Sequence, residues 1–101
     1  MPRAEHKRTP KAESGWLYND TGAIAIGGEQ WLTWLGTHTS FYYTSPIGTF
    51  TARRELRSGS WYWYAYRRRS GRLHRVYVGR SHELDAQRLM TVAQRLTDMA
   101  V

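Results

Sequence analysis

The 101-residue chain contains no cysteine, which excludes disulfide bonds, thiolate metal sites and thiol catalysis. It also lacks any apolar run near the roughly 20 residues that a membrane-spanning helix needs. Residues 1–14 carry charge without a hydrophobic stretch behind it. We therefore expect no membrane partner and no secretory leader, and we expect a cytoplasmic location.

Lysine is missing from residues 50–80, although this segment carries nine arginines and a single carboxylate, that of Glu55. Nine positive charges less one leave +8 in this segment, against +7 for the whole chain. A guanidinium presents a planar fork of donors that suits phosphates and guanine edges better than a lysine does. The charge pattern therefore predicts a polyanionic partner, with nucleic acid the first candidate.

Groups for catalysis or metal binding are scarce and dispersed. The four histidines show no short metal-ligand spacing, and the carboxylates form no evident acid–base pair. No glycine-rich loop has a phosphate-cradling pattern. We therefore predict that the protein is not an enzyme, holds no metal or cofactor, and takes no small-molecule substrate.

The chain divides into two parts. Residues 1–14 combine prolines and mixed charges without hydrophobic periodicity, which predicts a disordered basic arm. Residues 15–101 are expected to form a single α+β nucleic-acid-binding domain. A short strand is predicted near Gly15–Tyr18.

Helical periodicity occurs twice in residues 15–101. In Gly28–Thr37 the tryptophans and leucines recur at helical spacing, and Gly36 is a candidate end of that helix. Asp85–Ala100 is typical of an amphipathic helix with Asp85 as its N-cap. The expected apolar positions of this second helix are Ala86, Leu89, Val92, Ala93 and Leu96.

The strand registers follow from the turns. Trp61–Arg68 alternates sharply between two faces, and Ser58-Gly59 and Ser70-Gly71 on either side of it are plausible two-residue hairpin turns. A longer loop at residues 45–48 joins the preceding strand. The turns predict the pairs Phe41–Ala52, Tyr43–Phe50, Ala52–Ala65, Arg53–Tyr64, Leu56–Trp61, Tyr66–Arg75, Ala65–Val76, Tyr64–Tyr77 and Trp63–Val78.

These registers agree on which side chains share a face, and a slip of one residue would scramble the division. Arg54 is a misfit on the apolar face, where we expect it to stack over Trp63. The apolar face holds Phe41, Tyr43, Phe50, Ala52, Leu56, Trp61, Trp63, Ala65, Val76 and Val78, and the other face holds Tyr42, Thr51, Arg53, Glu55, Tyr62, Tyr64, Tyr66, Arg68, Arg75 and Tyr77.

The predicted fold is α+β. It consists of a small antiparallel β-sheet of three or four strands, a C-terminal amphipathic helix packed on one face, and one short helix before the sheet. We expect the C-terminal helix to cover the apolar face at Trp61, Trp63, Val76 and Val78, which leaves the tyrosine–arginine face uncovered. Exposed aromatic clusters commonly mark contact sites.

Double-stranded DNA is the predicted partner of the uncovered face. Tyrosine and arginine together suit phosphates, base edges and stacked bases. We expect Arg75 and Arg68 to contact bases and Arg53 to contact phosphate. The candidate nucleic-acid-binding residues are Arg53, Tyr62, Tyr64, Tyr66, Arg68, Arg75 and Tyr77.

The stretch GSWYWYAYRRRSGRLHRVYVGRSHELDAQRLMTVAQRL at residues 59–96 resembles an N-terminal segment of large LuxR-type, MalT-like bacterial transcriptional regulators. Upstream, WLTWLGTHTSFYY and GTFTARRE extend the resemblance to about residues 15–97. More distantly, the strand-rich basic part is similar to AP2-type and integrase arm-binding domains, which lay a three-stranded sheet in the major groove with a helix behind it. The resemblance implies DNA binding in transcriptional or mobile-element control, with the seven candidate residues facing DNA.

Three alternatives stay open. The tyrosine-rich face could bind another protein, which would make the chain an interaction domain of a regulator. The basic N-terminal arm could contribute to DNA binding or act only as a linker. An RNA-binding or ribonuclease role would use His74, Arg67, Arg75 and Tyr66, but the predicted pairing places His74 and Arg67 on the opposite face from the other two.

Overall fold

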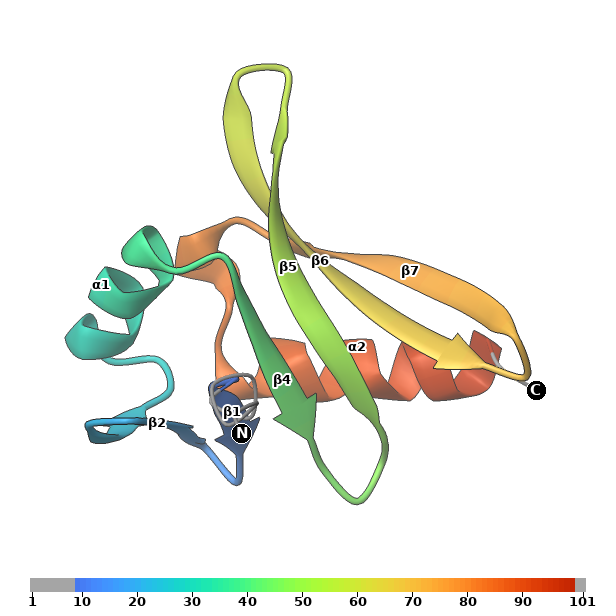
Figure 1. The fold of residues 1–101 in the computed structure, drawn as a ribbon, viewed down its shortest axis with the longest axis horizontal. Coiled ribbons are helices and arrows are strands. Elements are labelled where there is room, and N and C mark those ends of the chain that lie inside the picture. Colours follow the sequence, from blue (N-terminus) through green and yellow to red (C-terminus); the bar gives the residue numbers. More distant parts are fainter. Residues whose placement is uncertain (1–8, 100–101) are drawn as a thin grey trace, which may run out of the picture.

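The computed structural model describes residues 9–99, which form one sheet and two α-helices (Figure 1). Strands neighbour one another in the order β3-β2-β1-β4-β5-β6-β7. The elements are β1 (Lys11–Glu13), β2 (Trp16–Asn19), β3 (Gly22–Ala25), α1 (Glu29–Thr37), β4 (Ser40–Thr44), β5 (Thr49–Arg57), β6 (Ser60–Arg69), β7 (Arg72–Gly79), the 3₁₀-helix η2 (Ser81–Glu83) and α2 (Ala86–Met99).

The prediction of a three- or four-stranded antiparallel sheet is wrong. The described sheet has seven strands and is mixed, because β1 pairs parallel with β4 while the other neighbours are antiparallel. The short strand predicted near Gly15–Tyr18 is confirmed as β2 (Trp16–Asn19), whereas β1 and β3, which are three and four residues long, were not predicted. Strands of this length carry too little alternation to be recognised from side-chain pattern alone.

Part of the predicted disordered arm belongs to the sheet. Residues 11–13 form β1, which lies between β2 and β4. Ala12 is fully buried there, and the backbone N–H of Tyr42 donates to the carbonyl oxygen of Pro10 at 2.9 Å. Backbone bonding along both edges holds this segment although its side chains are mostly polar. Residues 1–8 of the predicted arm lie outside the described residues.

The turn-derived registers are confirmed except at one pair. Trp63 is paired with Gly79 and not with Val78, because a β-bulge inserts one residue into the end of β7. The confirmed pairs are Phe41–Ala52, Tyr43–Phe50, Ala52–Ala65, Arg53–Tyr64, Leu56–Trp61, Ala65–Val76, Tyr66–Arg75 and Tyr64–Tyr77.

Both α-helices pack on the apolar face of the sheet. Figure 1 shows α2 passing behind strands β4, β5 and β6, with β7 alongside, and α2 buries Leu89, Val92, Ala93 and Leu96. Ala86 is exposed, contrary to the prediction. The expected N-cap is confirmed, since Asp85 Oδ1 accepts the backbone N–H of Arg88 at 2.8 Å. Residue 100 of the predicted helix lies outside the described residues.

Helix α1 covers the same face beside α2. It buries Trp31, whose ring meets Phe41 edge to face at 5.5 Å and whose Nε1–H donates to the carbonyl oxygen of Leu84 at 2.6 Å. Phe41 in turn packs against Trp63 at 5.4 Å, which links the helix to the centre of the sheet. The helix continues through Gly36 to Thr37, one residue beyond the predicted end.

The β5–β6 hairpin projects beyond the body of the protein (Figure 1). Leu56 and Trp61 therefore lie on the apolar face but remain 56% and 49% exposed, so the prediction that α2 covers Trp61 is wrong.

Arg54 stacks on Trp61, with 4.7 Å from its guanidinium carbon to the ring centroid, and not on the predicted Trp63. Its Nη1 donates to the carbonyl oxygens of Leu35 and Gly36, both at 3.2 Å, which ties the hairpin to the end of α1.

Candidate nucleic-acid interface

The side of β5–β7 opposite the helices is named here the open face. Its side chains come from alternate positions of the three strands, and the register places them side by side. Neither α1 nor α2 packs on it, because both bury their apolar side chains against the other face. The open face consists of Arg53, Glu55, Arg57, Tyr62, Tyr64, Tyr66, Arg68, Leu73, Arg75 and Tyr77.

The three tyrosines of β6 each carry a guanidinium group on the ring. Arg75 lies over Tyr64 at 4.9 Å from the ring centroid, and Arg57 lies over the same ring at 5.2 Å. Arg53 lies over Tyr66 at 5.7 Å. Cation–π contacts of this kind hold the guanidinium planes near the sheet and reduce the side-chain freedom lost on binding.

On Tyr62 the guanidinium comes from outside the strands. Arg80, one residue after β7, lies over the Tyr62 ring at 5.1 Å, and its Nη2 donates to the Tyr62 hydroxyl oxygen at 3.3 Å. This hydrogen bond is the main reason why the pKa of Tyr62 lies below its ordinary value. Tyr77 packs against Tyr62 at 6.0 Å and edge to face against Tyr64 at 5.7 Å, so the tyrosines form one continuous cluster.

Glu55 is the single carboxylate in strands β4–β7 of the described chain. One of its oxygens accepts a bond from Arg57 Nη2 at 2.5 Å, and the other accepts a short bond from the Tyr66 hydroxyl. The bond from Arg57 first, and the bond from Tyr66 second, lower the pKa of Glu55. The open face and Arg80 therefore present five guanidinium groups against one ionised carboxylate.

The seven predicted site residues share this face, but their arrangement differs from the expected one. Arg53 lies near its middle, because it pairs with Tyr64 on the central strand β6. Arg68 lies at the end of β6, opposite Leu73. Arg68 also borders a polar hollow of the surface, together with Tyr42, Thr51 and Tyr66. The central positions of the open face thus belong to Arg53 and Arg75, whereas base contact was predicted for Arg75 and Arg68.

Sequence reasoning missed two arginines of the site. Arg57 follows Arg53 and Glu55 at the same two-residue interval, so continuing the alternation of β5 would have found it. Arg80 carries no such signal, because its position depends on the bulge at Gly79.

The outward face of the sheet continues past β5 with different chemistry. Trp16, Tyr18 and Tyr42 are 45%, 44% and 37% exposed, and the register places Tyr18 and Tyr42 beside Lys11. The charge of Lys11 is balanced by Glu13 at 3.4 Å. This second part of the face is therefore aromatic and close to neutral, whereas the open face of β5–β7 is cationic.

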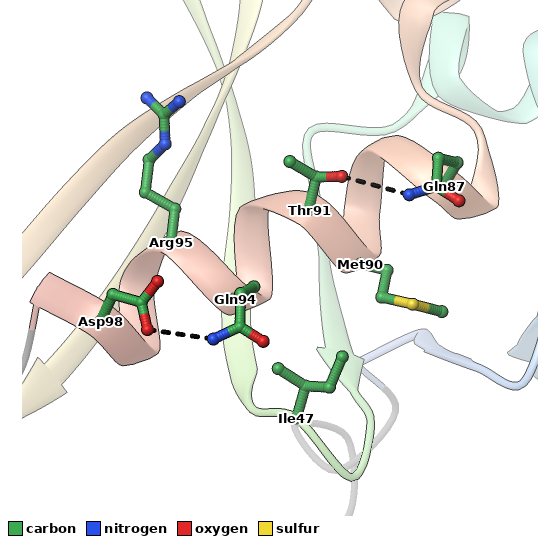
Figure 2. A pocket seen from close by; sticks show the side chains of 7 residues that line it. All are labelled: Ile47, Gln87, Met90, Thr91, Gln94, Arg95 and Asp98. Carbon is green, nitrogen blue, oxygen red and sulfur yellow. Dashed lines mark hydrogen bonds between the residues drawn. The ribbon is translucent and has the colours of Figure 1, made fainter.

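Other parts of the described surface lack a comparable constellation. The hollow in Figure 2 is an open depression along the solvent side of α2, lined by Met90, Ile47 and polar side chains. Within residues 9–99, no group of three potential metal ligands comes together. His74 and Arg67 form a cross-strand pair on the helix side, where Arg67 Nη1 donates to Thr97 Oγ1 at 3.0 Å. They are therefore separated from Tyr66 and Arg75 by the sheet.

No family model, curated protein or solved structure matches this chain. No helix in the described part of the chain is long and apolar enough to cross a membrane.

Proposed function

We propose that the protein binds double-stranded DNA through the open face. The observation that carries the proposal is the set of four arginines, Arg53, Arg57, Arg75 and Arg80, held on the rings of neighbouring tyrosines. Preordered guanidinium forks suit guanine edges and phosphates, and a small sheet fits the major groove. The resemblance to LuxR-type regulators and to AP2-type and integrase domains points the same way, toward transcriptional or mobile-element control.

The tyrosine rings favour duplex over single-stranded nucleic acid. Proteins that bind single strands offer free aromatic rings on which successive bases stack. Here a guanidinium already lies over Tyr62 and Tyr66, and two lie over Tyr64. A base could stack on these rings only by displacing an arginine, whereas a groove edge or a phosphate can meet the arginines where they lie.

The central position of Arg53 and Arg75 makes them the proposed base-reading residues. Arg68, at the end of β6 beside a polar hollow, is the proposed phosphate contact. We propose a cytoplasmic location, which fits the absence of cysteine, since disulfide bonds are rare in reducing compartments.

Protein binding is the second candidate, and the nearly neutral aromatic part of the face favours it there. Trp16 and Tyr18 are exposed without a net positive charge beside them. Aromatic side chains are enriched at protein interfaces, where charged residues are depleted at the core. A regulator could bind DNA with β5–β7 and another protein with β2.

The test is a binding titration of labelled duplexes, both selected from a random library and scrambled, at low and at physiological salt. We expect steep weakening with salt. Arg75→Ala should cost about 1–3 kcal/mol on the selected duplex and relax preference at one base pair. Arg72→Ala, which removes the same charge from the helix-side face opposite Arg69, is the matched control. Failure of the wild-type protein to bind any duplex at low salt would refute the proposal.

A further inference from the structure

The β-bulge at the end of β7 decides which face Arg80 joins. Up to Tyr64–Tyr77, each residue of β6 is paired in a regular antiparallel register with β7. If this register continued, Trp63 would pair with Val78 and Arg80 would fall opposite Trp61, on the helix side. Trp63 instead pairs with Gly79, which advances β7 by one residue. The next position, Arg80, therefore falls opposite Tyr62 on the outward side.

Gly79 permits this bulge for two physical reasons. Its φ of +141° is a conformation that L side chains rarely adopt. A Cβ atom at this position would also lie 2.6 Å from Glu83 Oε1, which is too close for a real contact. Bulges commonly re-aim a side chain next to a functional surface, and this one re-aims Arg80.

The turn that follows the bulge is rigidly held. The backbone N–H of Arg80 donates to Glu83 Oε1 at 2.8 Å, and the indole N–H of Trp63 donates to Ser81 Oγ at 2.9 Å. Arg88 Nη1 donates to the carbonyl oxygen of Val78 at 3.1 Å. These bonds fix the backbone on both sides of Arg80. The backbone there therefore loses little conformational entropy when the guanidinium of Arg80 binds a ligand.

We propose that Arg80, held on Tyr62, is a phosphate-binding anchor at one end of the open face. The proposal rests on the proposed binding of duplex DNA and adds how the sheet is oriented relative to the duplex. Arg80 is exposed, and its contact with Tyr62 uses the ring and one Nη2 bond, which leaves further N–H donors for a phosphate. A second guanidinium, that of Arg68, lies at the other end of the same strand.

The separation of the two ends fits a duplex. Tyr62 and Arg68 are six residues apart on β6, which corresponds to about 20 Å at roughly 3.4 Å per residue. The major groove is about 12 Å wide, so a strand of this span can meet both of its backbones at once. Strand β6 would then run across the groove, with Arg80 on one backbone, Arg68 on the other, and Arg53 and Arg75 over the base edges between them.

The experiment measures the salt dependence of binding to selected and scrambled duplexes for Arg80→Ala, Arg80→Lys and the control Arg72→Ala. One lost phosphate contact lowers the salt slope by about one and the affinity by about fivefold at roughly 0.15 M salt. We expect this loss for Arg80→Ala, equal on both duplexes. Arg80→Lys should keep the slope, because the charge remains, and Arg72→Ala should leave both quantities near the wild-type values.

Three results would overturn the anchor. Arg80→Ala could bind like the wild type while Arg75→Ala weakens binding, in which case duplex binding stands and the anchor is wrong. Arg80→Ala and Arg72→Ala could lower the slope equally, which would show an effect of bulk charge alone. Wild-type protein that binds no duplex would remove the proposed function itself, and the anchor with it.

Discussion

Trp63 and Tyr64 are neighbours on β6 and lie on opposite faces, so truncating each of them tests the face assignment. Trp63 is fully buried, packs on Phe41 at 5.4 Å and donates to Ser81 Oγ at 2.9 Å. Trp63→Ala should cost about 3–5 kcal/mol for the cavity. The loss of the partner of Ser81 adds about 1 kcal/mol.

Tyr64 should be far less costly to remove. Its ring is half-buried and contacts Arg57, Arg75 and Tyr77. Exposed cation–π contacts contribute about 0.5–1 kcal/mol each, and an aromatic pair contributes a similar amount. Tyr64→Ala should therefore cost about 1.5–3 kcal/mol in all.

Thermal unfolding followed by circular dichroism measures the difference. For a domain of this size, 1 kcal/mol shifts Tm by about 4–8 °C, so Trp63→Ala should lower Tm by roughly 4 °C or more beyond the effect of Tyr64→Ala. If Trp63→Ala does not fold, Trp63→Phe replaces it, because it keeps a ring and loses the Ser81 hydrogen bond. Equal falls in Tm for the variants of Trp63 and Tyr64 would refute the assignment of the two faces.

Three further changes have defined outcomes. The pKa of Glu55 is lowered in the folded protein, so its contribution to stability is present above its ordinary pKa and is lost as pH falls below about 4.5. In Glu55→Gln the free energy of unfolding should therefore depend less on pH in this acidic range. The same variant should bind duplex more tightly at low salt, because it removes a negative charge from the open face. Ser70→Asn should raise Tm, by up to about 1 kcal/mol of stability, because Ser70 has φ of 53° and asparagine tolerates this region better. Gly79→Ala should lower Tm, since both φ and the contact with Glu83 oppose a Cβ atom.

Each of these changes has a result that would contradict its reasoning. An unchanged acid titration for Glu55→Gln would mean that its bonds to Arg57 and Tyr66 do not stabilise the fold. A lower Tm for Ser70→Asn would contradict the left-handed turn conformation. A wild-type Tm for Gly79→Ala, measured beside Gly36→Ala as a control with open space around its Cβ position, would contradict the bulge.

The sheet of β4–β7 was predictable because each strand is long and each hairpin contains its own turn signal. Ser58-Gly59 and Ser70-Gly71 adopt positive φ at both residues, which sets the register of the strands on either side. The Ser14-Gly15 dipeptide adopts the same conformation and joins β1 to β2. Together with the strand predicted near Gly15–Tyr18, it was a sign of the N-terminal hairpin. Strand β1, with three residues, is too short to show alternation.

Two features of the structure, one in the fold and one in the site, had no signal in the sequence. The parallel pairing of β1 with β4 brings together residues about 30 positions apart. It is made by backbone hydrogen bonds, such as that from the N–H of Tyr42 to the carbonyl oxygen of Pro10, which leave no pattern in the side chains. The bulge at Gly79 breaks a register that the Ser70-Gly71 turn sets correctly for its first residues. A regular alternation therefore assigns Arg80 to the wrong face, while the same alternation places Arg53, Tyr64 and Arg75 correctly.

Chemical-shift mapping of the ¹⁵N-labelled protein with a short DNA duplex tests the central claim most directly. The backbone amides of β5, β6 and β7, the side-chain signals of Arg75, and the N–H of Arg80 should shift together as duplex is added. The solvent side of α2, at Met90 and Gln94, should not change. Shifts confined to α2 or to β2 at Trp16, or no shifts at a saturating concentration of duplex in low salt, would contradict the assignment of the open face as a DNA-binding surface.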